Sequence, residues 1–143
     1  GSGQPPALVI RAARDPAAAS LDRIQVVKGW VDAAGESHEQ VFDAVWAGDR
    51  VPDADGRIAK LASSVDLADG SHDDATGAAE LVTLWRDPQF DPEQAAFYYV
   101  RVLQIPTARH ALFDAIALGM DRPDTGPAVI RERAYTSPIW YQP

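Results

Sequence analysis

The chain has 143 residues and a mass of 15.4 kDa, which fits one domain, and 46% of its residues are hydrophobic, as in chains that bury a core. It has no cysteine, which excludes disulfides, thiolate metal sites and a cysteine nucleophile. Residues 32–74 hold 11 acids and 3 bases, so this segment alone accounts for the formal net charge of −8. Because nucleic acid binding depends on Lys and Arg that neutralise phosphates, this balance disfavours a nucleic acid partner. No apolar run approaches the ~18 residues of a membrane helix, so no membrane span is expected.

The first third of the chain predicts three strands. Residues 7–14 form the first strand, and Asp15-Pro16 ends it because proline lacks the donor that a central ladder needs. Residues 21–31 form a longer second strand with apolar residues on both of its faces. Gly35 lies in the turn that follows, and residues 39–46 return as the third strand, which predicts a hairpin. Residues 1–3 resemble the remnant of an expression tag and are excluded from the fold.

Residues 48–78 are the least regular part of the sequence. They are rich in Asp, Gly and Ser, and at most one short strand is expected, over residues 64–67. About thirty irregular residues are many for a compact domain, so part of this segment is expected to pack on a neighbouring domain. The isolated apolar residues that such a partner would cover are Ile58, Leu61, Val65 and Leu67.

The stretch 94–107, with the sequence QAAFYYVRVLQIPT, predicts the central strand of the fold. β-Branched and aromatic residues alternate along it and place apolar groups on both of its faces. Four of its residues also match positions of immunoglobulin-type domains. These are Gln94 for an acid, Ala96 for a small residue, Tyr98 for the corner tyrosine and Val100 for a core residue, with Gln94 as the departure.

The last third predicts one helix inside an all-β chain. Residues 107–118 carry an apolar stripe at helical spacing, with Thr107 as the capping residue and Gly119 at the end. The other expected elements are a strand over 79–85, a loop over 123–127, and a last strand over 129–136 and 138–141 that breaks at Ser137-Pro138. About seven strands with one inserted α-helix indicate an immunoglobulin-like β-sandwich, formed by residues 4–143 as a single domain.

The polar clusters of the sequence do not complete a metal or catalytic site. Asp53-Ala54-Asp55-Gly56 begins like a calcium loop, but the further oxygen ligands and the closing Glu are missing, which favours an Asp/Gly turn. Residues 71–74, with the sequence SHDD, have no spaced partner and indicate a solvated loop. The three histidines show no HxH, HxxxH or HExxH spacing. No catalytic residue, metal ligand or cofactor-binding residue is therefore predicted in this chain.

The four tryptophans all fall in predicted strands, so core packing is the favoured interpretation for most of them. Trp140 and Tyr141, close to the C-terminal end of the sequence, are instead candidates for an interface. An aromatic platform for a sugar is a further alternative, although a sequence does not show whether rings are exposed together.

Three long segments are similar to a known family. Residues 22–46, 76–107 and 132–141, the last with the sequence ERAYTSPIWY, resemble the C-terminal part of the bacterial domain-of-unknown-function family 3604 (DUF3604). Members of that family are larger, and their N-terminal portion resembles PHP-type metal-dependent phosphoesterases, with mainly His and Asp as ligands of the divalent metal. The resemblance therefore implies a parent that is a metal-dependent hydrolase, and no catalytic residue carries over to this chain.

The corner after the central strand departs from the family pattern. Gln104 stands where an acid is expected, and the residues after Thr107 are Ala-Arg-His where Pro-Arg-Trp is expected. If this corner borders the active site of the parent, the substrate preference differs; if it only packs the helix, nothing follows. The candidate interface residues are therefore Trp140, Tyr141, Arg109 and His110.

The favoured hypothesis is a non-catalytic accessory domain at the C-terminal end of a larger protein, which packs on the PHP-like N-terminal hydrolase domain of the same parent chain. The alternative is an independent β-sandwich module that binds a carbohydrate or a protein. The chain alone is expected to be inactive and to fold without a metal, because its aromatic and aliphatic residues supply a core. The compartment stays open, with a periplasmic or secreted parent as one alternative.

Overall fold

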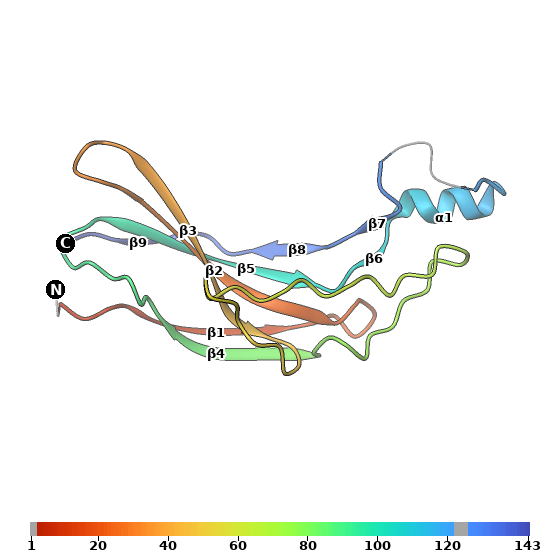
Figure 1. Ribbon diagram of the computed structural model, residues 1–143, viewed down its shortest axis with the longest axis horizontal. Helices are drawn as coiled ribbons and strands as arrows, with labels where there is room; N and C mark the ends of the chain where they lie inside the picture. Colours follow the sequence, from red (N-terminus) through yellow and green to blue (C-terminus); the bar gives the residue numbers. More distant parts are fainter. Residues whose placement is uncertain (1–2, 122–125) are drawn as a thin grey trace.

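The computed structural model describes residues 3–121 and 126–143, and Figure 1 shows their arrangement. The described residues form nine strands and one helix: β1 (Ala7–Ala13), β2 (Leu21–Val31), β3 (Ser37–Trp46), β4 (Glu80–Arg86), β5 (Ala96–Gln104), β6 (Thr107–Ala108), α1 (His110–Ala117), β7 (Val129–Ile130), β8 (Arg133–Tyr135) and β9 (Ile139–Tyr141). Strands β1 and β4 pair in an antiparallel two-stranded sheet. Strands β3, β2 and β5 form the larger sheet in that order, and β8 and β9 both pair with the other side of β5.

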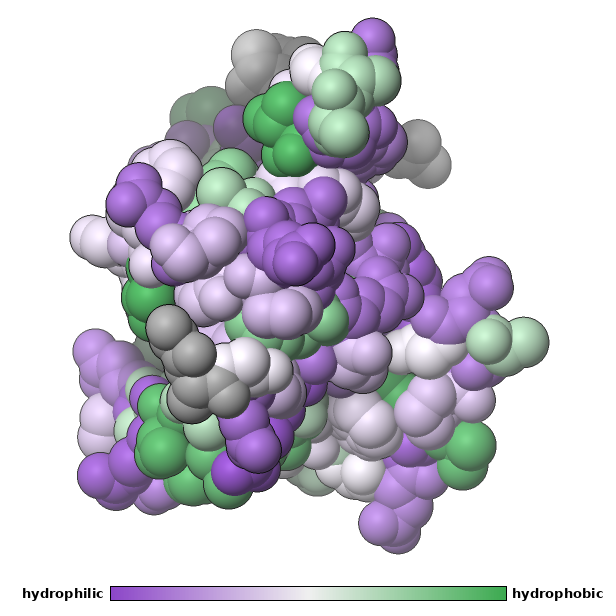
Figure 2. All heavy atoms as spheres, turned by 90° about the vertical axis from the view of Figure 1, so that its left-hand side faces the viewer, coloured by the Kyte–Doolittle hydropathy of each residue, from purple (hydrophilic) through white to green (hydrophobic). Residues whose placement is uncertain are grey.

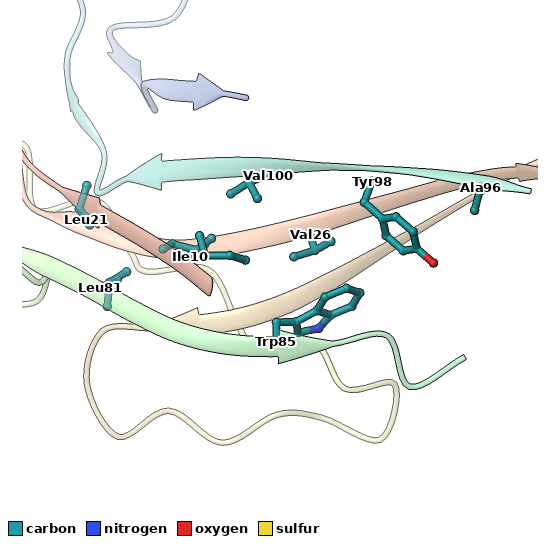
Figure 3. Packing of buried hydrophobic residues seen from close by; sticks show 9 residues of the cluster. Ile10, Leu21, Val26, Leu81, Trp85, Ala96, Tyr98 and Val100 are labelled. Carbon is teal, nitrogen blue, oxygen red and sulfur yellow. The ribbon is translucent and has the colours of Figure 1, made fainter. Parts of the chain in front are cut away.

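The apolar core lies between these two sheets, as Figure 3 shows. Alternate residues of β2 and β5 point into it because successive side chains of a strand face opposite sides, and Val26 and Tyr98 are almost fully buried there. Ile10 of β1 and Trp85 of β4 close the core from the smaller sheet. The predicted all-β sandwich is therefore confirmed, and β5 holds the central position expected for it.

The β2–β3 hairpin forms as predicted, and its turn shows why. Gly35 has a positive φ of 85°, a conformation that glycine adopts without steric cost. The Asp32 carboxylate accepts hydrogen bonds from the backbone N–H groups of Ala34 at 2.9 Å and Glu36 at 3.0 Å, which closes the turn. Strand β3 therefore begins at Ser37, slightly earlier than the sequence pattern suggests.

The segment 48–78 contains no strand, so the short strand expected over 64–67 is not formed. Its carboxylates accept hydrogen bonds from nearby backbone N–H groups: Asp53 from Asp55 at 3.0 Å, and Asp66 from Ala68 at 2.8 Å. Such local bonds offer the backbone an alternative to a sheet ladder. The segment instead runs from the end of β3 toward the helix and back to β4, in yellow to light green in Figure 1.

Helix α1 begins at His110, later than the predicted start at Thr107. The backbone of Thr107 and Ala108 pairs with β7 in a short ladder, so Thr107 is not available as a cap. Arg109 is the N-cap residue instead, and its side chain makes no capping hydrogen bond. Gly119, with a φ of 67°, follows the end of the helix as expected.

The last predicted strand is divided into three short ones. Strand β7 pairs with β6, whereas β8 and β9 pair with β5 on either side of the expected break at Ser137-Pro138. Arg131 lies between β7 and β8, and its side chain turns toward Asp22, which interrupts the run. Residues 122–125, which include most of the loop expected at 123–127, lie outside the described residues.

Candidate functional site

The four candidate interface residues form two pairs at opposite ends of the molecule (Figure 1). Trp140 and Tyr141 lie on β9, beside the first residues of β5. Arg109 and His110 lie at the start of α1, at the other end of the sandwich. The structure therefore does not bring the two pairs together, and each pair belongs to a separate surface.

A polar groove of about 680 Å³ lies beside α1. Gln104 and Ala108, at two of the positions that depart from the family pattern, line this groove together with His72, Asp74 and Glu132. His72 Nε2 is 3.6 Å from Asp74 Oδ1, so the two side chains form a loose pair. The groove thus lies between the acidic segment and the corner after β5, where the sequence departs from the family pattern.

Arg109 and His110 are exposed and do not line the polar groove. The backbone N–H of Arg109 donates to the Ala128 carbonyl at 2.8 Å, which continues the contact between the two chain segments that flank the helix. His110 Nε2 is 3.7 Å from Asp114 Oδ1, one turn along α1, and both side chains are largely exposed. Both side chains therefore lie on the surface at the start of α1.

The carboxylates considered for calcium take part in turns. Asp53 Oδ1 accepts hydrogen bonds from the backbone N–H groups of Asp55 at 3.0 Å and Arg57 at 2.8 Å, and Gly56 has a φ of 72°. This is the Asp/Gly turn that the sequence favoured. Across residues 3–121 and 126–143, no three His, Cys, Asp or Glu side chains are grouped so that they could hold a metal ion.

A buried ionic cluster surrounds Asp22 at the start of β2. Arg131 Nη1 donates a hydrogen bond to Asp22 Oδ2, and Arg50 Nη2 lies 2.8 Å from Oδ1 at an angle that makes an ion pair without a hydrogen bond. Arg23 Nε lies 3.8 Å from Asp22 and 3.6 Å from Asp43, and all three of these side chains are almost fully buried. Burial lowers the pKa of Arg131, and the adjacent Asp22 charge opposes that shift.

The arginines of this cluster also bind the segment 48–78. Their other N–H groups donate to backbone carbonyls: Arg23 to Ile58 at 2.5 Å, Arg50 to Ala59 at 2.9 Å, and Arg131 to Leu61 at 2.9 Å. The cluster thereby fixes the irregular segment against one end of the larger sheet.

The apolar residues of this segment are covered differently from what the sequence suggested. Ile58 has only 4% of its surface exposed, so the domain itself buries it without a neighbour. Leu61 and Val65 are half-buried, and Leu67 is exposed. The segment is therefore part of this domain's own packing rather than a surface left wholly for another domain.

A second buried ionic group lies inside the sandwich. Lys28 Nζ is 2.6 Å from Asp87 Oδ2 and donates to the Gln89 carbonyl at 2.7 Å. The Tyr98 hydroxyl donates to the same Asp87 oxygen at 2.8 Å. Burial, and then the hydrogen bond to Asp87, raise the pKa of Tyr98 well above its ordinary value of 10.0, so this hydroxyl stays protonated. In an immunoglobulin-type corner the tyrosine bonds to the backbone instead, and the immunoglobulin-like assignment stays a prediction.

The outer face of the larger sheet carries an aromatic row, which consists of Trp140, Phe97, Tyr99 and Tyr135. Ring centroids are 5.3 Å apart for Trp140 and Phe97, 6.4 Å for Phe97 and Tyr99, and 6.3 Å for Tyr99 and Tyr135. Trp140 and Tyr135 are 68% and 56% exposed. Trp140 is thus an exposed residue, in contrast to Trp85 in the core.

An aromatic groove of about 700 Å³ lies at the Trp140 end of this row, between β9 and the β2–β3 hairpin. Gly29, Val31, Glu39, Phe97 and Trp140 are among its lining residues. Figure 2 faces this end of the molecule and shows hydrophobic side chains in green between hydrophilic ones. The interface predicted at Trp140 thus coincides with a hollow in the surface.

Gly29 is the residue that the sequence reasoning missed here. It pairs with Phe97 across β2 and β5, and a Cβ atom at position 29 would overlap the Phe97 ring. A glycine inside a strand often marks a close approach of another group, so this residue was the signal in the sequence for the groove.

The smaller sheet has an aliphatic face on its outer side, formed by Val9 of β1 with Val82 and Leu84 of β4. Val9 and Leu84 are cross-strand partners, and they are 80% and 54% exposed. Val82 is also exposed and lies opposite Arg11. The aliphatic face and the aromatic row are on opposite outer sides of the sandwich, because the core lies between the two sheets.

The molecule is thus an all-β sandwich domain whose buried charges bind one another and the backbone. The sequence model of the family described as "Protein of unknown function (DUF3604)" matches residues 1–143, and the chain belongs to this family. No curated protein and no solved structure matches the chain. No helix in the described part of the chain is long and apolar enough to cross a membrane.

Proposed function

We propose that the chain is a non-catalytic accessory domain that packs on a PHP-like, metal-dependent hydrolase domain of the same parent chain. The observation that carries this proposal is the aliphatic face of the smaller sheet, where Val9, Val82 and Leu84 are exposed together. Grouped apolar side chains on a surface mark sites of interaction more often than isolated ones do. A neighbouring domain would supply the third layer that covers this face.

The buried charges support the non-catalytic part of the proposal. The Asp22 carboxylate is enclosed by arginines, and Asp87 by Lys28 and Tyr98. Active sites hold perturbed groups beside a cleft that a substrate can enter. Here the partners of each carboxylate come from separate strands and loops of the domain, so these charges join parts of the fold to one another.

The experiment compares the full-length parent with this domain alone. Both are assayed for hydrolysis of model phosphoesters with and without a divalent metal, and both are footprinted with hydroxyl radicals. We expect metal-dependent turnover by the parent only, and protection of Val9 and Leu84 in the parent relative to the isolated domain. Leu118, which is 73% exposed on the helix side, is the control residue for footprinting.

Two results would contradict the proposal. Turnover by the repurified domain alone would overturn the non-catalytic assignment. Equal labelling of Val9 and Leu84 in the domain and in the parent would show that the aliphatic face is not a contact surface.

A Val82→Lys substitution in the parent adds a second readout, because a charge on a covered face should lower the parent's melting temperature more than Leu118→Lys does.

A further inference from the structure

We propose that the aromatic row and the aromatic groove form a binding site for a neutral saccharide. This inference does not depend on the proposed packing of the aliphatic face, because the two surfaces lie on opposite sides of the sandwich. It gives the domain a ligand of its own in addition to a contact with a parent domain.

The rings are presented by the sheet itself. Phe97 and Tyr99 alternate with core residues on β5, and their planes are nearly parallel, at 11°. Trp140 from β9 and Tyr135 from β8 extend the row at its two ends, tilted by 53° and 44° to their neighbours. Because they stand on paired strands, the four rings are held in position before any ligand arrives.

Gly29 allows the Phe97 ring to lie over β2. With any larger residue at position 29, the new Cβ would overlap this ring, so the ring would have to stand away from the sheet. Glycine weakens the interior of a strand, because it has no side chain to pack. At position 29 its absence of a side chain leaves room for the Phe97 ring to lie flat on β2. The consequence is a hollow between Trp140 and the hairpin rather than a filled surface.

Polar side chains border the hollow. The Glu39 carboxylate, the Ser37 hydroxyl and the Gln142 amide line it, and none of them is paired with another side chain within residues 3–121 and 126–143. The groove volume of about 700 Å³ falls in the range of small-molecule sites, about 300–1,000 Å³. A few polar groups beside an apolar lining is the arrangement by which such sites orient a ligand.

A saccharide fits these features better than other ligands. A pyranose ring has an apolar C–H side that stacks on an aromatic ring, and hydroxyls at its edge that donate to a carboxylate such as Glu39. An acidic polysaccharide is disfavoured, because Asp32, Glu36 and Glu39 give the hairpin beside the groove a negative charge. A nucleic acid is disfavoured for the same reason. The geometry therefore points to a neutral saccharide.

Native gels that contain a soluble polysaccharide test the inference. The probes are laminarin, xyloglucan and galactomannan as neutral chains, and alginate as the acidic comparison. We expect retarded migration in at least one neutral gel and none in alginate. Trp140→Ala should weaken the retardation about three- to tenfold, the equivalent of one aromatic contact, while Trp140→Phe retains most of it. Leu118→Ala, at an exposed apolar residue just after the helix, should migrate like the unchanged domain.

Each contrary result overturns the site. If no neutral polysaccharide alters the migration of the domain, these saccharides are excluded as ligands and the proposed site is wrong. Equal retardation of the unchanged domain and Trp140→Ala would place binding elsewhere. Footprinting of the parent supplies the protein alternative: if Trp140 is protected in the ligand-free parent as strongly as Val9, the aromatic face is a domain contact rather than a saccharide site. Circular dichroism of each variant ensures that a lost fold is not read as lost binding.

Discussion

The sandwich and the segment 48–78 belong to one domain, but different interactions hold them. In the sandwich, antiparallel ladders join β2 to β3 and β5, and an apolar core lies between the sheets. The segment has no ladder, and arginines from the cluster around Asp22 bind its carbonyls instead. A segment with few apolar residues can therefore be fixed by charged side chains that are themselves anchored in a sheet.

Removal of the Asp22 charge should have the largest effect on stability, because Asp22 neutralises the arginines that bind the segment 48–78. In Asp22→Asn, the guanidinium groups of Arg131 and Arg50 lose the buried carboxylate that neutralises them. Breaking a buried ion pair on one side costs about 3–5 kcal/mol, and we expect a loss of this size in urea unfolding. Trypsin should also cut faster at Arg57 and Lys60, which lie in the released segment.

Asp49→Asn is the matched control, because Asp49 has the same chemistry and is exposed near the same strand end. Its stability and its tryptic pattern should stay close to those of the unchanged domain. If Asp22→Asn behaved like this control, the cluster around Asp22 would not be the anchor of the segment.

Tyr98→Phe tests the corresponding charged group inside the sandwich. The substitution keeps the ring in the core and removes the hydrogen bond to Asp87. Hydrogen bonds to charged groups contribute about 1.5–3 kcal/mol, so the unfolding free energy should fall by that amount. Proteolysis of the segment 48–78 should be unchanged, since Lys28 and Asp87 lie far from its anchor. Faster cleavage there would show that the two regions are coupled.

The same tyrosine gives the sandwich a dependence on alkaline pH. Because the folded state raises the pKa of Tyr98, its contribution to stability is complete below the ordinary tyrosine value of 10.0 and is lost as the pH rises above it. Unfolding free energies measured between pH 8 and roughly 11 should fall more steeply for the unchanged domain than for Tyr98→Phe. Parallel curves would mean that other tyrosines cause the loss.

Asp74 connects the far end of the segment to the turn before β2, and its contribution should be smaller. Its carboxylate accepts from the Ser20 backbone N–H at 2.8 Å and from Arg14 at 3.0 Å. The Ser20 hydrogen bond, and then the charges of His72 and Arg14, lower its pKa against the effect of burial. Since this side chain is partly exposed, Asp74→Asn should cost only about 0.5–1 kcal/mol. The difference from the unchanged domain should disappear as the pH falls below the ordinary aspartate value of 3.8. A difference that persisted in acid would assign the effect to packing.

Calcium should have the smallest effect on the acidic segment. Asp53 is engaged in its own turn, and screening of like charges is the only stabilisation that we expect from salt. Melting curves in EDTA, in sodium chloride and in calcium chloride of equal ionic strength should agree for the two salts. A melting rise specific to calcium would reveal a site among Asp53, Asp55, Asp73 or Asp74 and would change the account of how the segment is held.

The strands of the sandwich were predictable because local pattern and final packing agree. The alternation around Tyr98 and the turn at Gly35 both express periodicities that a sequence shows directly. The predicted start of α1 was wrong because Thr107 pairs with β7, about twenty residues further along the chain. Local sequence patterns do not reveal such a distant partner. The division of the last strand has the same origin, since Arg131 is drawn to a carboxylate at the other end of the chain.

The candidate surfaces were predictable only in part. Trp140 was predicted as a candidate interface residue from its position, and the structure shows it exposed beside a groove. Its neighbours Tyr135 and Phe97 come from other strands, and their alignment depends on the register between β5, β8 and β9. Register between distant strands is set by the whole sheet, so a sequence alone does not give it.

The pairing of β1 with β4 has a consequence for the rate of folding. This ladder joins Ala7 to Arg86 and Ala13 to Glu80, so the ends of a very long loop must meet before any of its bonds can form. The β2–β3 hairpin closes over a short turn and can form on a timescale of about 1–10 μs, whereas domains dominated by distant pairings fold in about milliseconds to seconds. We therefore expect the smaller sheet, and with it the aliphatic face, to form after the β2–β3 hairpin, so that Val9 and Leu84 lie in unpaired segments until this long loop closes.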